Sequence, residues 1–514
     1  MVVEECSLPS KSTFKLLLPQ IIACFIKNYA VFTAGLATQF PTVIIPELTG
    51  IAPTDGFKET LSITSEESSW FGSLTYICQL IGSIIGGHVI DIFGRQRILL
   101  ISITPSVIAF LMFYFANSVV VLFAAYTIIG ISNGVLLVAA VTYTGETCQA
   151  SIRAVMLSTA TVSYSAGSLV LYTLGSLTNW RLVALISTIF PISSFLLVLT
   201  VPETPIWLLS KGYEEKARET LQWLRGWSTP EFVEEEFQLL KASIEDNSQY
   251  YSEEKSEYLK IIEKFKDFTS RSNLAPIFIT FLLFLICQSN GIIAMTPFLV
   301  QIFKALGTNV DANWSTVVVA SVSLAGTISC AATVKFLGKR KLCLGGLTMC
   351  SVSCAFLGFY ALKELPTGWN SFHLPPDVEV KSSWIPLVCI MGLFFFTSLS
   401  IADIPWMYMA ELFPFKIRGF SNGIILAVAL LIGFVNTKAY KDLEVGFSIG
   451  GAMIFFSVFT IIFIPLLYLF LPETEGISTD DIEKFFSHKN HRITQVNIKK
   501  FLESEKQKES KISK

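Results

Sequence analysis

Long apolar runs separated by short polar loops dominate this chain of 514 residues. A helix needs about 20 apolar residues to cross a lipid bilayer. The pattern therefore predicts an all-α integral membrane protein with twelve transmembrane helices. The predicted spans are residues 16–46, 69–89, 98–116, 119–141, 154–177, 182–201, 275–303, 315–336, 342–362, 384–410, 420–439 and 446–471.

One polar segment, residues 202–274, divides the spans into two groups of six. It is predicted to be a water-facing linker of short amphipathic helices, among them Glu214–Leu224 and Glu253–Phe268. Because each half has an even number of spans, both termini and the linker lie on one side of the membrane. The predicted parts are an N-terminus at 1–15, a six-helix bundle at 16–201, the linker at 202–274, a second six-helix bundle at 275–471 and a tail at 472–514.

Charged signatures that follow the spans occur twice. Glu146 precedes Arg153 by seven residues, and Glu411 precedes Arg418 by the same interval, an offset of 411 − 146 = 265. Pro202-Glu203-Thr204 recurs as Pro472-Glu473-Thr474, an offset of 472 − 202 = 270. Two similar membrane halves with matching charges at one face are typical of an alternating-access transporter.

Composition and charge add an orientation. Hydrophobic residues make up 52% of the chain and charged residues only 15%, against about 25% in soluble domains. Basic residues concentrate in the linker and in the loops around Arg95 and Lys339, and the positive-inside rule places these in the cytosol with both termini. The expected location is the plasma membrane. The acids of the opposite loops are Asp55, Glu59, Glu66, Glu67, Asp377, Glu379 and Glu444.

Several classes of function lack their sequence signatures. The chain has no GxxxxGK[ST] phosphate loop, no hydrolytic constellation and no metal-ligand spacing among its four histidines. Its basic residues are not clustered as nucleic-acid binding requires. We therefore expect no enzyme, no cofactor, no metal and no nucleic-acid partner, and transport that runs on a gradient. The sequon Asn313-Trp314-Ser315 falls outside in this topology and is a candidate glycosylation site.

Six motifs, in the expected order and on the expected side, resemble those of the sugar porter family of the major facilitator superfamily. Within that family the closest resemblance is to the insect facilitated trehalose transporters, over about residues 16–480. The motifs are Gly87-x3-Asp91-x2-Gly94-Arg95, Tyr143-x2-Glu146-x6-Arg153, Trp180-Arg181, Pro202-Glu203-Thr204-Pro205-Ile206-Trp207-Leu208, Pro405-Trp406 with Glu411-Leu412-Phe413-Pro414 and Arg418-Gly419, and Leu471-Pro472-Glu473-Thr474-x-Gly476.

The charges of these motifs predict a latch at the inner ends of the helices. Partly buried pairs of arginine and carboxylate are directional, so they can hold the inner mouth closed and separate when it opens. The alternative is that the charges only mark the membrane surface. The predicted latch residues are Asp91, Arg95, Glu146, Arg153 and Glu203 in the first half and Arg340, Glu411, Arg418 and Glu473 in the second.

The resemblance also implies a sugar site, although several of the family's amides are missing. The pattern Gln-Gln-x-x-Gly-x-Asn of helix 7 reads Cys287-Gln288-Ser289-Asn290-Gly291-Ile292-Ile293, and the helix 11 asparagines fall near Ala429 and Gly433. An unpaired amide facing lipid would be costly, so Gln288 is expected to face the cavity. The predicted substrate-binding residues are Thr161, Gln288, Asn290, Ser398, Asp403 and Trp406.

Asp403 lies inside a predicted span, where an acid is a functional hypothesis by default. It can bind a proton, a cationic solute or a sugar hydroxyl, or be a buried acid satisfied by Ser400, Thr397 or the backbone. Proton-coupled sugar porters resemble one another in carrying an acid in helix 1 and an arginine in helix 4. In this chain the two positions fall near Ala37 and at Tyr126. The absence of this acid and arginine favours facilitated diffusion unless Asp403 has taken over proton transfer.

Other departures lie at the cytosolic face. Lys27, in the first span, is expected to extend its side chain toward the cytosol. Ile206, Glu475 and Lys335 replace residues of the family pattern, which is expected to weaken the closed-inside latch and favour an inward-open state.

Three functions stay open at this stage. The first is a trehalose or hexose uniporter, the second a carrier of a cationic or less polar solute on the same scaffold, and the third a sugar sensor that does not transport. The expected partners are a small-molecule sugar and the lipid bilayer, and the sequence leaves the oligomeric state open.

Overall fold

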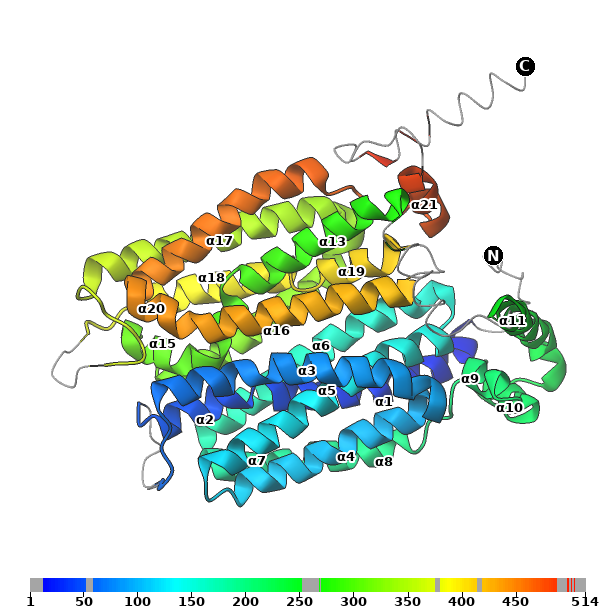
Figure 1. The fold of residues 1–514 in the computed structure, drawn as a ribbon, viewed down its shortest axis with the longest axis horizontal. Coiled ribbons are helices and arrows are strands. Elements are labelled where there is room, and N and C mark those ends of the chain that lie inside the picture. Colours follow the sequence, from blue (N-terminus) through cyan, green and yellow to red (C-terminus); the bar gives the residue numbers. More distant parts are fainter. Residues whose placement is uncertain are drawn as a thin grey trace.

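A computed structural model describes residues 13–51, 59–251, 268, 270–374, 380–413, 418–487, 497, 498, 501 and 503. The predicted all-α membrane architecture is confirmed. Among these residues, eleven helical stretches are long and apolar enough to cross a membrane, and the last, Ser421–Phe470, contains two helices that meet at Ser448. Counting that stretch as two gives the twelve expected crossings. The two halves lie side by side, with the N-terminal half in blue to cyan and the C-terminal half in green to orange (Figure 1).

The N-terminal half begins with α1, in which Lys27 is buried, 1% exposed, beside the thiols of Cys24 and Cys148. The expectation that this lysine reaches toward solvent is therefore wrong. The helices of this half are α1 (Thr13–Thr38), α2 (Phe40–Leu48), α3 (Ser65–Phe93), α4 (Arg95–Tyr114), α5 (Val119–Thr147), α6 (Ala150–Leu177), α7 (Trp180–Ser187) and α8 (Ile189–Val198).

Three linker helices follow, α9 (Pro205–Ser210), α10 (Glu214–Leu224) and α11 (Pro230–Tyr251). The second has the predicted bounds, whereas the helix predicted at 253–268 lies outside the described residues apart from Phe268. Buried apolar side chains such as Trp207 and Phe237 hold the three helices together. Figure 1 shows α9–α11 at the same end of the molecule as α21 (Thr479–Ser487), and we call this end the inner end and the opposite end the outer end.

The C-terminal half repeats this plan. Its helices are α13 (Arg271–Ser289), α14 (Ile292–Met295), the 3-10 turn η1 (Thr296–Phe298), α15 (Leu299–Leu306), α16 (Ala312–Leu337), α17 (Lys339–Glu364), α18 (Ile385–Leu399), α19 (Ile404–Glu411) and α20 (Arg418–Phe470).

Apart from the short interruption at Thr188 between α7 and α8, where the backbone angles remain helical, three of the described spans are broken. The first breaks at Gln39, just before Pro41, and the seventh breaks at Asn290-Gly291, where Gly291 has φ +95°. The tenth breaks at Ser400–Asp403, just before Pro405. A break frees backbone groups, which membrane proteins tolerate only where protein or a cavity satisfies them. Broken helices therefore mark the candidate site.

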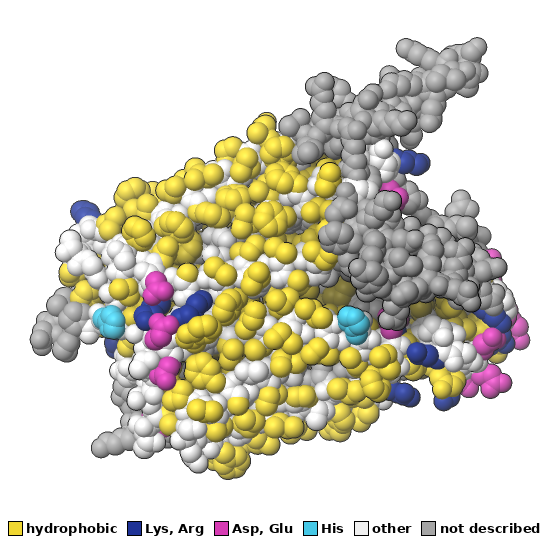
Figure 2. All heavy atoms as spheres, in the orientation of Figure 1, with side chains coloured by type: hydrophobic (Ala, Val, Ile, Leu, Met, Phe, Trp, Pro, Cys, Tyr) yellow, Lys and Arg dark blue, Asp and Glu magenta, His cyan; other side chains and the backbone are white. Residues whose placement is uncertain are grey.

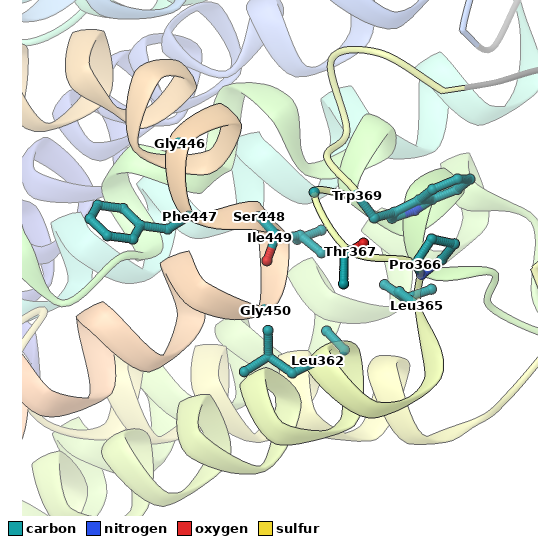
Figure 3. A pocket seen from close by; sticks show the side chains of 12 residues that line it. Leu362, Leu365, Pro366, Thr367, Trp369, Gly446, Phe447, Ser448, Ile449 and Gly450 are labelled. Atoms are coloured by element: carbon teal, nitrogen blue, oxygen red, sulfur yellow. The ribbon is translucent and has the colours of Figure 1, made fainter.

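The two helices of α20 meet at the outer end, at Ser448, whose φ of 66° is left-handed. Ile449 donates its backbone N–H to the Trp369 carbonyl at 2.9 Å, which ties this turn to the loop after α17. A small pocket lies between the two (Figure 3). Its lining contains no charged side chain, and we assign it no role in binding.

The buried core differs between the two ends. One large apolar cluster joins both halves and contains Phe40 and Phe71 together with Phe298 and Tyr440. Toward the inner end each half has its own cluster, around Tyr143 in the first half and Tyr408 in the second. Hydrophobic side chains cover the middle of the visible surface, and charged side chains gather toward its ends, as expected for a membrane protein (Figure 2).

Close packing of α3 on α5 generates a stability prediction. A Cβ added at Gly82 would lie 2.1 Å from the Ile131 carbonyl oxygen, whereas a Cβ added at Gly87, in the same helix, would meet nothing within 4 Å. Gly82→Ala should therefore destabilise the protein by about 1–3 kcal/mol through overpacking. Thermal unfolding of the purified protein measures this, with Gly87→Ala as the matched control. Equal melting temperatures for the two variants would contradict the packing argument.

Candidate functional site

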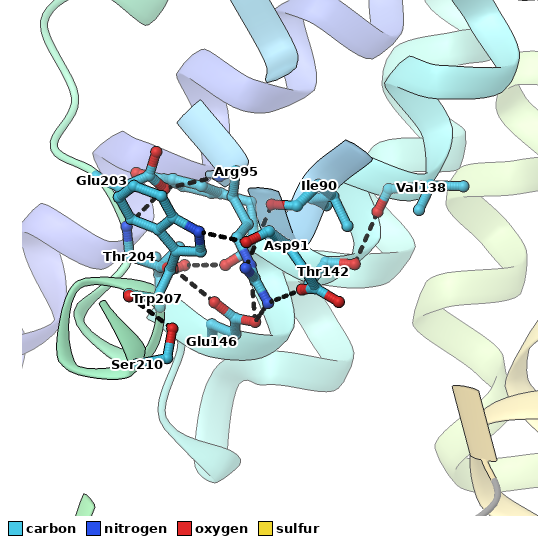
Figure 4. A network of polar contacts seen from close by, with 12 residues as sticks. Ile90, Asp91, Arg95, Val138, Thr142, Glu146, Glu203, Thr204, Trp207 and Ser210 are labelled. Atoms are coloured by element: carbon cyan, nitrogen blue, oxygen red, sulfur yellow. Dashed lines mark hydrogen bonds and ion pairs between the residues drawn. The ribbon is translucent and has the colours of Figure 1, made fainter. Parts of the chain in front are cut away.

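The inner end of the N-terminal half contains a network of charges around Arg95 (Figure 4). Its guanidinium forms ion pairs with Asp91 at 3.0 Å and Glu146 at 2.8 Å. Thr204 donates its hydroxyl to Glu146 at 2.6 Å. The Glu203 carboxylate accepts the backbone N–H groups of Arg95 at 2.9 Å and of Gln96, so it binds the N-terminus of α4. Four predicted latch residues are thus in contact.

The C-terminal half has the equivalent network, but its cation is Lys339. The ammonium of Lys339 pairs with Glu411 at 2.7 Å and with Glu475 at 2.8 Å. Glu473 accepts the backbone N–H groups of Lys339 and Arg340, both at 3.1 Å, at the N-terminus of α17. Thr474 donates to Glu411 at 2.7 Å, as Thr204 does to Glu146.

Two expectations about this network need correction. The Arg340 guanidinium donates to the Tyr468 carbonyl at 2.6 Å and lies over the Tyr468 ring, so Arg340 contributes its backbone to the network and not its charge. Glu475, expected to weaken the latch, instead supplies a second carboxylate to Lys339. Lys339 supplies the cation of this network, and Glu475, which replaces a residue of the family pattern, supplies its second carboxylate.

Of the other two predicted latch arginines, Arg153 lies outside these networks. The Arg153 guanidinium donates to the Cys148 carbonyl, at 3.1 Å and 3.3 Å, and remains exposed. Arg418 begins α20, and its side chain lies outside what the structure describes. Within the described ranges, each inner network stays inside its own half, because no ion pair at the inner end joins the N-terminal half to the C-terminal half.

Among the described residues, the ion pairs between the halves lie at the outer end. Glu66 of α3 forms ion pairs with Lys438 and with Lys441 of α20, the latter at 2.9 Å. The Lys438 ammonium also lies 4.7 Å from the ring centroid of Trp70. Ser69 donates its hydroxyl to the Lys438 carbonyl at 2.8 Å. The sequence identified Glu66 only as an outer acid, since its partners lie more than 370 residues away.

The first and seventh spans add two contacts at the same end. Thr42 donates its hydroxyl to the Thr296 carbonyl at 2.8 Å, and Gln301 donates its amide to the Thr49 hydroxyl at 2.9 Å. With the ion pairs of Glu66, these bonds close the outer end.

Asp403 lies at the break in the tenth span and is 6% exposed. Its side chain does not cap α19. The Thr161 hydroxyl, from α6 in the other half, lies close to it and donates its proton to the Ser158 carbonyl at 2.8 Å, and Cys287 and Cys330 also lie close to Asp403. Among the described residues no basic side chain pairs with it. Thr161 and Asp403, both predicted from sequence, thus meet across the interface between the halves.

Gln288 and Asn290, the two predicted amides of helix 7, have different hydrogen-bond partners. Gln288 is 8% exposed, and its Oε1 has no partner among the described residues. Asn290 instead spans the helix break, because its Oδ1 accepts the backbone N–H of Ile292 at 3.2 Å and its Nδ2 donates to Thr397 at 3.4 Å. The Asn290 side chain therefore stabilises the break and has less capacity left for a ligand.

The remaining predicted residues occupy separate places. Ser398 bonds Ser323 through their hydroxyls at 2.7 Å. Trp406 is 37% exposed and packs edge-to-face on Phe284, with ring centroids 5.2 Å apart. Asn313 lies in the first turn of α16 at the outer end, and its sequon partner Ser315 is buried.

Comparison with known proteins identifies similar families and folds. The family model described as sugar (and other) transporter matches residues 17–486. The facilitated trehalose transporter Tret1 of Apis mellifera ligustica is 30% identical over 478 residues, which cover 93% of this chain and 90% of the relative. The facilitated trehalose transporter Tret1-2 homolog of Drosophila sechellia is 30% identical over 484 residues, which cover 94% of each chain.

Solved structures give the same fold. The inward open conformation of the xylose transporter XylE from E. coli superimposes with a TM-score of 0.66 at 18% identity and covers 92% of this chain and 99% of its own. The proton:xylose symporter XylE bound to 6-bromo-6-deoxy-D-glucose gives a TM-score of 0.64 at 19% identity, with the same coverage.

The inner network of the C-terminal half generates a second prediction. Lys339→Ala leaves Glu411 and Glu475 without their cation, which should cost about 2 kcal/mol or more of stability. Lys339→Arg should retain most of the pairing. Thermal unfolding measures both, and Lys341→Ala, an exposed lysine of the same helix, is the control. A Lys339→Ala variant as stable as Lys341→Ala would contradict the assignment.

The outer contacts generate a third prediction. Glu66→Gln removes the charge that binds Lys438 and Lys441, so amide hydrogen exchange should become several-fold faster in α2 and η1, at the outer contact between the halves. Glu67→Gln is the matched control, since Glu67 bonds only Thr64 within the cap of its own helix. The assignment fails if both variants exchange alike.

Proposed function

Because the chain belongs to the sugar (and other) transporter family, we propose that it carries trehalose or a hexose by facilitated diffusion. It is a multi-pass sugar transporter that works by alternating access, and it is not an enzyme. The proposal concerns the sugar and the energy source. Relatives named facilitated trehalose transporter support trehalose as the first candidate.

The observation that carries the mechanism is the difference between the two ends of the molecule. Among the described residues, the ion pairs between the halves lie at the outer end, where Glu66 binds Lys438 and Lys441. The inner networks around Arg95 and Lys339 each remain within one half. A rocking motion can therefore break the outer contacts while each half keeps its own network. In the outward-facing state we expect the two inner networks to approach each other and form the predicted latch.

The polar groups at the interface suit a neutral, hydroxylated solute. The Asp403 carboxylate can accept hydrogen bonds from sugar hydroxyls, with Thr161 beside it and the unpaired Gln288 oxygen as a further acceptor. Trp406 offers an apolar face to a pyranose ring. These roles, and those of Ser398 and Asn290, are part of the proposal.

Tyr126 and Ala37, the residues at the positions of the proton-coupling pair, support facilitated diffusion. Tyr126 of α5 donates its hydroxyl to the Thr38 carbonyl at 2.7 Å. Ala37, on the other side, is fully buried. A neutral hydrogen bond therefore joins the first and fourth spans where the resemblance would place an acid and an arginine. Asp403 is the one described acid at the centre of the interface, and we propose that it binds the solute.

A second candidate follows from the same residue. A buried carboxylate without a basic partner attracts cations. A cationic solute on this scaffold is therefore the alternative that Asp403 favours. For location we propose the plasma membrane with cytosolic termini, since the inner end carries Arg95, Arg97 and Lys339–Lys341. Asn313 would then face outward as a glycosylation site.

Uptake of labelled trehalose and glucose into cells that express the chain tests the proposal. We expect saturable uptake that does not change with external pH or with a protonophore. Asp403→Asn should weaken neutral sugar uptake by about tenfold or less, because an amide still accepts a hydrogen bond. Collapse of a cation or proton-coupled flux in this variant would support the alternative. Asp442→Asn, exposed in the same half, is the control. Absence of uptake of either sugar, with the protein at the surface, would overturn the proposal.

A further inference from the structure

One face of α6 carries a stripe of hydroxyl side chains along the interface. Its members are spaced by 3, 4, 7 and 11 residues from the first, which places them on one side of a helix. With a rise of about 1.5 Å per residue, the stripe is about 16 Å long. Its members are Thr161, Tyr164, Ser165, Ser168 and Tyr172.

The inner part of the stripe faces the C-terminal half. Thr161 lies beside Asp403, and the Ser165 hydroxyl is 3.5 Å from that of Thr327 in α16. These contacts belong to the site proposed above.

The outer part of the stripe meets the break in the first span. Tyr172 donates its hydroxyl to Gln39 Oε1 at 3.2 Å and lies 3.4 Å from the Thr42 hydroxyl. The Tyr164 hydroxyl lies beside the side chains of Gln39 and Thr38. Gln39 and Tyr164 are half-buried, so both are partly accessible at the interface. An amide and two phenols therefore meet at a helix break, which is where transporters of this kind bind their ligands.

The ring of Tyr76, from α3 of the same half, lies near the two phenols and contacts α20 of the other half. A Cβ added at Gly433 would lie 3.1 Å from the Tyr76 ring and 3.4 Å from Gln288 Oε1. Gly433 is thus what allows the Tyr76 ring to approach α20, near the place where the family pattern has an asparagine. The unpaired Gln288 oxygen lies beside this ring. The second half contributes space here, and the first half contributes the side chain.

We propose that Gln39, Tyr164 and Tyr172, with Tyr76 beside them and Gln288 from the other half, form a subsite for the second glucosyl ring of a disaccharide. The inference rests on the proposed function. The first ring binds at Thr161 and Asp403, one turn or more toward the inner end. The amide and phenols bond the hydroxyls of the second ring, and the Tyr76 ring packs on its apolar face. A hexose fills one of the two subsites, whereas a disaccharide fills both.

The test compares a disaccharide with a hexose in the full-length transporter expressed in cells. We measure the KM for labelled trehalose and the Ki of glucose as a competing inhibitor. Gln39→Ala and Tyr164→Phe should each raise the ratio of trehalose KM to glucose Ki by about tenfold, since each removes hydrogen bonds that only the second ring uses. Tyr29→Phe is the matched control, because the Tyr29 hydroxyl bonds Ser193 within the N-terminal half. Thr161→Val should raise both constants together.

The outcomes separate this inference from the proposed function. A ratio that stays at the wild-type value in both variants overturns the second subsite and leaves sugar transport intact. Wild-type uptake of glucose without trehalose also overturns the subsite alone. No uptake of any sugar overturns the proposed function and the subsite with it. If Tyr164→Phe fails to reach the surface, the same ratio is measured for Gln39→Ala and for Gln39→Asn, whose amide is one methylene shorter.

Discussion

The bilayer contains no water that could satisfy an unpaired backbone or charged group, and the rest of this structure depends on that constraint. Straight helices satisfy themselves and can face lipid. The three broken spans cannot, and their breaks at Gln39, Asn290-Gly291 and Ser400–Asp403 are covered by protein. Asn290 spans one break with its own side chain. Polar chemistry is therefore concentrated between the halves, which is where a solute has to pass.

The strength of the contacts differs between the two ends in the way a rocking transporter requires. The Arg95 and Lys339 networks are largely buried, and each also involves the N-terminus of a helix. Such charge-assisted bonds are among the stronger ones in proteins. The Glu66 pairs are exposed to solvent, where screening by water and salt leaves each pair only a small net contribution. Weak contacts between the halves can break while strong contacts within each half persist.

Part of this arrangement can be predicted from sequence and part cannot. Hydropathy predicts the spans because a helix must be apolar along its length to face lipid. The repeated motifs predict that Glu146 and Glu411 meet cations, because the two halves share a plan. The identity of the second cation is missed, since Lys339 and Arg340 are adjacent and only the direction of α17 decides between them. Glu66 and Lys438 carry no shared motif, and their pairing requires the packing of α3 on α20.

The missing amides of the family pattern do not leave the interface apolar. At Gly433 the loss of a side chain makes room for Tyr76 of the other half, whose ring lies beside Gln288. Tyr126 similarly replaces a charged pair by a hydroxyl bond to Thr38. In both places a tyrosine of the N-terminal half substitutes for chemistry that the family pattern assigns elsewhere. Polar capacity is thus redistributed toward phenols, which combine a hydrogen bond with an apolar face and suit a sugar ring more closely than a small ion.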